Sequence, residues 1–436
     1  MALKSADDYS LVRVPIEARR PMWEVFMIRF GAVVCLPLLM TGATIGYGMT
    51  LKDVIIATLL GVLILEIVSF LSGVAGALEG MSTSFLSRWT GFGQIGSALI
   101  GLVISITATG WFGIQNSVFA EGLYSAFGGK VNLQLIMLIS GIGITLIVVY
   151  GYRMLSYVAN IAVPAFIIGV LWATSKMLGN YSFSEILSSS PPGEPMTIGV
   201  AATVVAGGFM VGAVITPDLS RFNRNAWDVF WMTLLSLLLG EVVMNFIGAG
   251  MAHVSKTSDV VKIMYQLGGW FAAFLVIFST IKINDLNLYA ASLGITNFLD
   301  AVFNIKVNRG VVTLFVGLIG TVLSIMGILD KFVNFLLILG VAIPPIGGIM
   351  VVDYFILKRF RKVLEESRKK GELPQIVESI NPIAILSWII GSLIGYYVHW
   401  GIPALNSLIT AGALYWIISV IWSKITRQHP LVFVKN

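Results

Sequence analysis

About twelve apolar segments, each long enough to cross a lipid bilayer, follow one another along the 436 residues of this chain. A transmembrane helix needs about 20 mostly apolar residues to cross about 30 Å of hydrocarbon. Only 11% of the residues are charged and the mean hydropathy is +0.90, whereas a soluble domain carries about 25% charged residues. The sequence therefore predicts an all-α membrane protein of about twelve transmembrane helices.

The predicted spans lie near residues 25–48, 54–79, 95–124, 132–151, 155–176, 196–216, 227–252, 266–298, 310–329, 331–356, 381–400 and 404–423. The third and eighth exceed one crossing, so they are expected to tilt strongly or to end in short surface helices. Pro37 and the pair Gly207-Gly208 are expected to interrupt the first and sixth spans. Paired interruptions of this kind occur in transporters built from inverted repeats. Residues 1–24 have no apolar core, so we expect no cleaved signal peptide.

Charge bias predicts the orientation in the membrane, because cytoplasmic loops carry an excess of Lys and Arg. Of the 28 Lys and Arg residues, 21 fall on the side of the N-terminus, six fall on the other side, and Lys282 lies within a span. Arg29 is counted with the first group. Both termini are therefore expected in the cytoplasm, with the chain in the inner (cytoplasmic) membrane. The basic run at 357–372 is expected to be a solvated linker near anionic headgroups.

Several function classes lack their sequence signals. The chain has no H-E-x-x-H, G-x-S-x-G, Walker A or C-x-x-C motif, so no enzyme activity is expected. The single cysteine, Cys35, and three scattered histidines predict no metal site and no cofactor. The net charge of +6 follows from the orientation and requires no nucleic acid. The expected surroundings are the lipid bilayer, and the sequence does not specify an oligomeric state.

Four ionisable residues lie well inside predicted spans: Glu66, Glu241, Lys282 and Asp285. Such groups usually face a partner or a cavity, because each costs at least about 2.5 kcal/mol at the bilayer centre. One interpretation is that they form ion pairs between helices. The eighth span favours a functional interpretation, since residues 278–292 also contain Asn284, Asn287 and Ser292, which is typical of a polar cavity wall.

Aromatic and amide residues of the third and sixth spans complete a candidate site. Trp111 and Gln115 are four residues apart and share one helix face. An indole offers a flat stacking surface, and an amide can donate to and accept from the edge of a stacked ring. In the sixth span, Gly208 is expected to free main-chain groups beside a second aromatic ring, Phe209. The alternative is ordinary aromatic packing beside a hydrogen bond between helices.

At these residues the chain resembles the nucleobase–cation symporter-1 family, particularly its cytosine permease branch. The matching stretches are GWFGIQ (110–115), TPDLSRFNRNAW (216–227), INDLNLYAASLG (283–294) and AIPPIGGIMVVDYF (342–355). The resemblance implies a fold of five plus five inverted-repeat helices with two added C-terminal helices. It thus implies a tail (1–24), a ten-helix transport core (25–356), a basic cytoplasmic linker (357–380), two further helices (381–424) and a tail (425–436).

The resemblance also implies a function, the import of a small planar heterocycle by alternating access. Cytosine, purines, hydantoins and allantoin are the ring types that the family carries. Trp111 and Phe209 would sandwich the ring, and its edge would be addressed by Gln115, Gly208, Asn284, Asp285 and Asn287. Cytosine permeases have a glutamine one helical turn before the tryptophan, and this chain has Ala108 at that place. It has Gln115 one turn after the tryptophan instead, an arrangement that resembles the hydantoin carriers.

A second departure from the family concerns the coupling ion. Sodium-coupled members place two hydroxyl residues before the Asn of the eighth span, and this chain has Lys282 and Ile283 there. Our hypothesis is that the Lys282 ammonium replaces sodium near Gly31 and Val34, with Glu241 or Asp285 as counter-charge, so that protons drive transport. The alternatives are a sodium-coupled symporter, a sodium-independent facilitator and a non-transporting membrane sensor.

Overall fold

A computed structural model describes residues 9, 12–150 and 152–426, except for some side chains, chiefly in α7 and α13. Within this part of the chain no residue forms a named strand, and the structure is helical almost throughout. The helices are α1 (Met22–Val33), α2 (Leu36–Gly48), α3 (Leu51–Glu79), α4 (Thr83–Trp89), α5 (Gly93–Ala126), α6 (Leu133–Tyr150), α7 (Tyr152–Asn180), α8 (Phe183–Ser188), α9 (Ile198–Val214), α10 (Pro217–Ser220), α11 (Ala226–Ser236), α12 (Val243–Ser255), α13 (Val260–Phe303), α14 (Arg309–Ile325), α15 (Phe332–Ala342), α16 (Pro344–Val351), α17 (Arg361–Lys370), α18 (Pro382–Tyr397) and α19 (Pro403–Thr426). Two π-helical turns, η2 (Leu237–Val242) and η4 (Val352–Leu357), and the 3₁₀ turns η1 (Ile16–Ala18) and η3 (Ile328–Lys331) complete the order.

The predicted membrane spans are present. Six helical stretches of the described chain are long and apolar enough to cross a membrane, and the bent pair α1–α2 makes a seventh. Three shorter apolar helices, α6, α14 and α18, and the long helices α7 and α13 occupy the remaining predicted positions. The prediction of an all-α, multi-pass membrane protein is confirmed.

The predicted helix interruptions are only partly correct. The first span does break, by 54°, but at Val34 and Cys35, and Pro37 lies within the first turn of α2. The second interruption is wrong, because α9 continues through Gly207 and Gly208 as far as Val214. Gly207 serves close packing instead, since a Cβ there would overlap the main-chain carbonyl of Leu336 in α15. Small residues allow such backbone approach between membrane helices.

The eighth span includes a short outer helix, which was one of the two alternatives for its length. Gly269 has φ 68° and ψ −168°, values that no α-helix contains, so α13 changes direction there. Residues 260–268 therefore form a separate helical piece, and residues 270–303 form the long inner part of α13.

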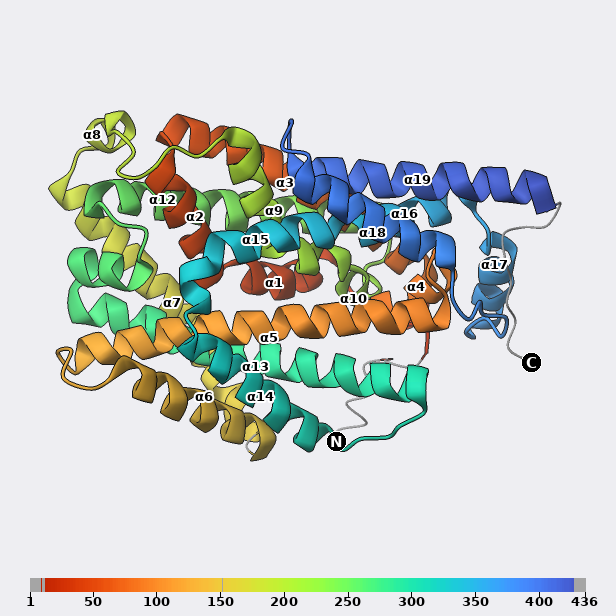
Figure 1. Cartoon of the computed structure of the whole chain (residues 1–436), viewed down its shortest axis with the longest axis horizontal. Helices are drawn as coiled ribbons and strands as arrows, with labels where there is room; N and C mark the ends of the chain where they lie inside the picture. Colours follow the sequence, from red (N-terminus) through yellow and green to blue (C-terminus); the bar gives the residue numbers. More distant parts are fainter. Residues whose placement is uncertain (1–8, 10–11, 151, 427–436) are drawn as a thin grey trace.

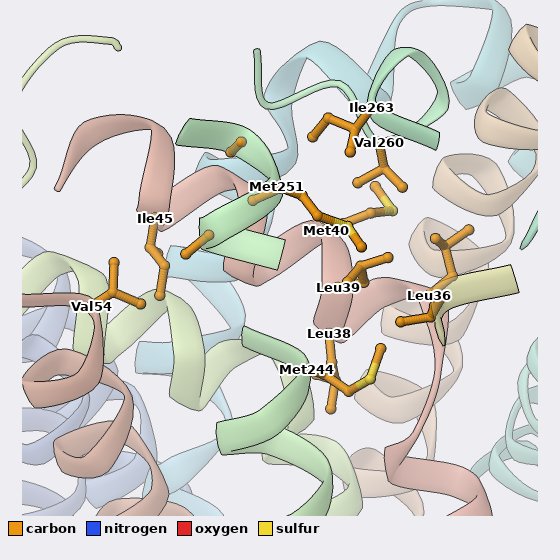
Figure 2. Packing of buried hydrophobic residues seen from close by; sticks show 14 of the residues in the cluster. Leu36, Leu38, Leu39, Met40, Ile45, Val54, Met244, Met251, Val260 and Ile263 are labelled. Carbon is orange, nitrogen blue, oxygen red and sulfur yellow. The ribbon is translucent and has the colours of Figure 1, made fainter. Parts of the chain in front are cut away.

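Figure 1 shows the helices lying roughly along the longest axis, with α8 at one end and α17 at the other. Helices α1, α2, α3, α9, α11 and α12 pack together as one group, and α5, α6, α7, α13 and α14 pack as a second. The hairpin of α18 and α19 packs against α15 and α16. Figure 2 shows buried side chains of α2 meeting those of α12 and α13, for example Met40 near Met251 and Val260.

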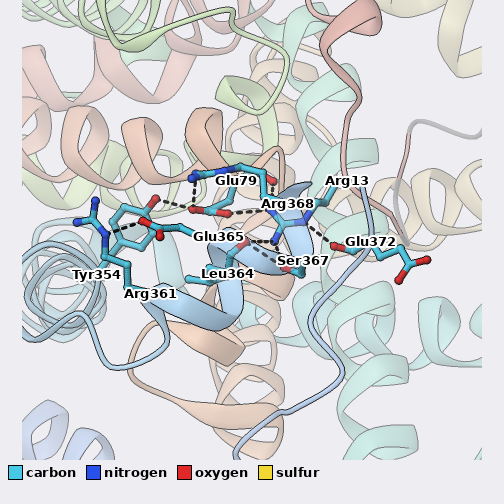
Figure 3. Close-up of polar contacts among 9 residues, drawn as sticks. All are labelled: Arg13, Glu79, Tyr354, Arg361, Leu364, Glu365, Ser367, Arg368 and Glu372. Carbon is cyan, nitrogen blue, oxygen red and sulfur yellow. Dashed lines mark hydrogen bonds and ion pairs between the residues drawn. The ribbon is translucent and has the colours of Figure 1, made fainter. Parts of the chain in front are cut away.

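Helix α17 is held on the protein by a buried polar cluster at that end of the molecule (Figure 3). The carboxylate of Glu79 accepts from Arg13 (2.8 Å), Arg368 (3.0 Å) and the hydroxyl of Tyr354 (2.7 Å). Arg13 also donates to Ser367 on α17 (2.7 Å). Of the α17 residues only Leu364 and Ser367 are buried, and most of the others are exposed, so the helix remains largely solvated. These contacts dock one face of it on the protein.

Candidate functional site

The break between α1 and α2 leaves main-chain groups without helical partners inside the bundle. Val34 (ψ 87°) and Cys35 (φ −148°, ψ 164°) leave the helical conformation. The last carbonyl groups of a helix lack intrahelical partners and form the negative end of the helix dipole. The predicted coupling residues Gly31 and Val34 thus lie at an electronegative half-helix end, a place suited to a cation.

Glu241 lies beside this break. It belongs to the π-helical turn η2, a rare conformation that occurs frequently at functional sites. A Cβ on its neighbour Gly240 would overlap the side chain of Val33, so this turn touches the end of α1. Glu241 is fully buried, its Oε1 accepts from Asn245 at 3.3 Å, and its Oε2 has no hydrogen-bond partner among the described residues. A buried carboxylate of this kind requires a proton or a counter-charge.

The packing of α5 against α13 brings the other predicted residues to one level. The two helices run in opposite directions, and their backbones approach at Gly101 and Gly294, where a Cβ on Gly294 would lie 2.6 Å from the Gly101 carbonyl oxygen. Ten residues further on α5 is Trp111, and ten residues back on α13 is Asn284. Each lies about 15 Å along its helix from the glycine contact, at a rise of about 1.5 Å per residue. Trp111 and Asn284 therefore lie at the same depth on neighbouring helices.

Three amides near this depth have unused hydrogen-bonding capacity. Gln115 and Asn284 are fully buried, and neither polar atom of either side chain has a partner among the described residues. The Nδ2 of Asn287 is also unpartnered. Leaving a buried polar group unsatisfied costs about 1–3 kcal/mol, so such groups in one region indicate a site that a polar ligand completes.

The two predicted aromatic residues lie where the two largest apolar clusters meet. Trp111 and Phe209 are both partly buried, and each packs against both clusters. The Trp111 ring makes T-shaped contacts with Phe332 (6.1 Å between centroids) and Phe335 (5.2 Å). Gly208 lies within α9 and frees no main-chain group, which corrects the sequence prediction. A Cβ on Gly208 would meet Thr41 Oγ1 of α2 at an ordinary 3.4 Å.

Cavities of unequal size lie at the two ends of the molecule. A cavity of about 1040 Å³ lies at the α17 end between α4, α5, α10 and α13, and its lining reaches Gly101 and Tyr289. A cavity of about 270 Å³ lies towards the α8 end, lined by Glu121, Asp259 and Phe332 among others. Tyr289 is only five residues from Asn284, so the larger cavity approaches the candidate site from the end that sequence predicts to be cytoplasmic.

For two predicted residues, Lys282 and Asp285, the described part of the chain shows no contact that tests the predicted role. The side chain of Lys282 lies outside the described part of the structure, so its interaction with Gly31, Val34 or Glu241 stays a prediction. Asp285 is half-buried on α13.

Arg29 is a site residue that could not be recognised from the sequence. Arg29 is 1% exposed and lies two turns inside α1, which begins at Met22 rather than at residue 25. Its guanidinium lies over the ring of Phe209, 5.3 Å from the centroid. It interacts electrostatically with Glu66, which accepts a hydrogen bond from Thr233 (2.8 Å). The only available signal was an arginine among apolar residues near a span boundary, and such residues usually lie at the membrane surface.

Comparison with known proteins identifies the family. Residues 13–419 match the family described as permease for cytosine/purines, uracil, thiamine, allantoin. The cytosine permease of Escherichia coli (strain K12) is 30% identical over 426 residues, which covers 96% of each chain. The hydantoin permease of Microbacterium maritypicum is 23% identical over 369 residues, 79% of this chain and 74% of the relative.

Solved structures share the fold. The inward-facing conformation of Mhp1 has a TM-score of 0.80 at 18% identity and covers 98% of this chain and 96% of its own. Mhp1, a nucleobase-cation-symport-1 family transporter, in a closed conformation with bromovinylhydantoin bound, has a TM-score of 0.74 at 18% identity, over 95% of this chain and 96% of its own. The chain therefore belongs to the nucleobase–cation symporter-1 family of permeases and is a multi-pass membrane transporter rather than an enzyme.

Proposed function

We propose that this transporter imports a small planar nucleobase-like ring by alternating access, with the ring bound between α5, α9 and α13. The observation that carries the proposal is the pair of buried, unpartnered amides, Gln115 and Asn284, near the depth of Trp111. Together they offer donors and acceptors that match the alternating N–H and C=O groups at the edge of such a ring. The indole of Trp111 and the ring of Phe209 provide stacking surfaces. The relatives named as cytosine and hydantoin permeases support this substrate class.

The test is ligand-induced thermal stabilisation of the purified protein. Cytosine, uracil, hypoxanthine, hydantoin and allantoin form the panel, and the variants are Trp111→Ala and Asn284→Leu. We expect one ring to raise the melting temperature of the wild type in a saturable manner, and each variant to reduce the shift. A panel without any shift, or a shift that both variants retain in full, would contradict the proposed site.

We further propose that protons drive transport, with the Lys282 ammonium in place of sodium. Two features of the described residues support a cation between α1 and η2. The carbonyl end of α1 at Gly31–Val34 is electronegative, and Glu241 presents an unpartnered, buried carboxylate oxygen beside it. A lysine on α13 would neutralise both the carbonyl end of α1 and the Glu241 carboxylate. Deprotonation of the lysine, or protonation of Glu241, would remove this attraction and release the lysine side chain.

The same carbonyl groups and carboxylate also favour the alternative, a sodium ion, because oxygen ligands suit that cation. Lys282→Ala distinguishes the two, with Lys306→Ala, a lysine beyond the end of α13, as the matched control. Under our proposal Lys282→Ala abolishes proton-driven accumulation and Lys306→Ala leaves it unchanged. Transport that requires sodium and survives Lys282→Ala unchanged overturns the proposal.

The orientation in the membrane is also a proposal. The α17 end carries Arg88, Arg221, Arg361 and Arg368 on α4, α10 and α17 and at their ends, which the positive-inside rule assigns to the cytoplasm. We propose that both termini are cytoplasmic and that the protein lies in the inner membrane. Reporter fusions at the two termini and in the 181–197 loop test this: alkaline phosphatase is expected to be active only in the loop.

A further inference from the structure

Arg29 makes an unusual set of contacts for an arginine within a membrane span. Its Nε donates to Ser236 Oγ (3.0 Å), its Nη1 to Thr216 Oγ1 (3.1 Å) and its Nη2 to Ser69 Oγ (2.9 Å). Nη1 also donates to the Gly212 carbonyl (3.4 Å). No carboxylate of the described residues lies within ion-pair distance of it. The guanidinium thus joins α1 to α3, α9 and α11 through neutral acceptors.

Two of these hydroxyl groups are oriented towards the arginine. Ser236 Oγ donates its proton to the Thr233 carbonyl (2.9 Å), and Thr216 Oγ1 donates to the Ala213 carbonyl (2.7 Å). A hydroxyl has a single proton, so each presents only its lone pairs to Arg29. Both hydroxyl groups therefore act as hydrogen-bond acceptors for the cationic guanidinium.

The fifth contact of the guanidinium is the ring of Phe209, and Gly212 holds the same ring. A Cβ on Gly212 would lie 2.6, 2.8 and 2.8 Å from Cζ, Cε1 and Cε2 of Phe209. These nearly equal distances to three ring atoms mean that a ring face, and not its edge, rests on Gly212. Arg29 also donates to the Gly212 carbonyl, so the guanidinium, Gly212 and the Phe209 ring contact one another. The tilt of the ring is therefore set by contacts with a cation and with a residue that has no side chain.

We infer that Arg29 is a positioning residue for substrate binding: it sets the tilt of Phe209, and thereby the surface on which the transported ring stacks. The inference rests on the proposed function, in which Phe209 is a stacking residue. Arg29 belongs to α1, five residues before the break at Val34. It therefore also links the stacking surface on α9 to the half-helix at which the coupling cation is proposed to bind.

The test combines variants of Arg29 and Gly212 with a double-mutant cycle, using tritiated cytosine and tritiated hydantoin as probes. We expect Arg29→Met to raise the Kd and the KM about tenfold, with the maximal rate per folded molecule changed less than twofold. Tenfold corresponds to about 1.4 kcal/mol, which is within the usual range for a cation over an aromatic face. Arg29→Lys restores part of the affinity, because an ammonium retains the contact with the ring but has fewer donors. The matched control is Arg13→Met, which removes a buried arginine far from the site and leaves the Kd unchanged.

The cycle with Phe209→Leu decides between positioning and general structure. If Arg29 acts through the ring, Arg29→Met has no further effect on Kd in a Phe209→Leu background, whereas additive losses overturn the inference. If Arg29→Met does not fold, Gly212→Ala displaces the same ring while keeping the charge, and an unchanged Kd for that variant overturns it. Phe209→Leu alone tests the proposed function, because normal binding by this variant would contradict the stacking role of Phe209. If Phe209→Leu binds weakly while Arg29→Met binds normally, the stacking role stands and only the positioning role of Arg29 fails.

Discussion

Neighbouring residues Gln115 and Asn116 provide a sharp test of which buried amides are functional. Both side chains are fully buried on α5. Asn116 is satisfied by the protein, since it donates to the Met137 carbonyl (2.9 Å) and to Ser324 (3.2 Å) and accepts from Ser140 (2.7 Å). Gln115 has no partner among the described residues. We interpret Asn116 as structural and Gln115 as a residue kept for a ligand.

The perturbation is Gln115→Met, with Asn116→Leu as the matched control. Methionine keeps the length of the unbranched side chain and removes the unpaired amide, so the ligand-free protein is expected to gain about 1–3 kcal/mol, the usual desolvation penalty. Bound substrate loses its hydrogen bonds to Gln115, and its own polar edge is left unpaired. We therefore expect the Kd to rise about 10- to 100-fold, or about 1.4–2.8 kcal/mol. Asn116→Leu breaks made hydrogen bonds and is expected to lower stability with the Kd unchanged in the folded fraction.

The assay is a thermal melt of each purified variant, without ligand and with increasing ligand. A higher melting temperature combined with a smaller ligand-induced shift supports the assignment of Gln115. A Gln115→Met protein that is less stable than the wild type, or that binds the ring with unchanged affinity, refutes it.

Three further predictions concern stability and packing. Glu79→Gln removes the buried charge that pairs with Arg13, so we expect a loss of about 3–5 kcal/mol, measured as a lower melting temperature; an unchanged melt contradicts the importance of the Figure 3 cluster. Burial raises the pKa of Glu378, which lies outside the spans, from 4.5 to about 7. Between these pH values the folded state binds more protons than the unfolded state, so the free energy of unfolding should fall as pH rises through that window. Glu378→Gln should flatten the dependence of the melting temperature on pH over the same window. Gly207→Ala should destabilise by about 1–3 kcal/mol through overpacking against α15, whereas Gly208→Ala should fold normally and weaken binding; equal melting temperatures for the two alanine variants would contradict the packing described for α9.

Much of the architecture follows from the sequence for a physical reason. Hydrocarbon thickness sets the length of a span, so runs of about 20 apolar residues locate most of the spans to within a few residues, and the charge bias predicts their orientation. The tryptophan and amide of α5 were also predictable, since a four-residue spacing fixes a shared helix face.

Other features depend on tertiary packing that no local pattern encodes. A glycine in a membrane helix can interrupt the helix or allow a neighbouring helix to pack closely. The contact with Leu336 shows that Gly207 allows close packing, and the sequence does not reveal this contact. The contacts of Arg29 could not be predicted, because its three hydroxyl partners are far apart in the sequence: Ser69 on α3, Thr216 at the start of α10 and Ser236 on α11. The docking of α17 was missed for the same reason, because Glu79 and Arg368 are 289 residues apart.

The central claim is proton-driven import of a planar ring, and uptake into proteoliposomes tests it most directly. Radiolabelled cytosine, with uracil, hypoxanthine, hydantoin and allantoin as competitors, would be measured with a proton gradient in sodium-free buffer and with a sodium gradient at equal pH. Our account predicts saturable accumulation with the proton gradient alone, inhibited by the ring that fits the site best. Accumulation that requires the sodium gradient would contradict the role given to Lys282, and the absence of saturable uptake of every ring would contradict the proposed substrate class.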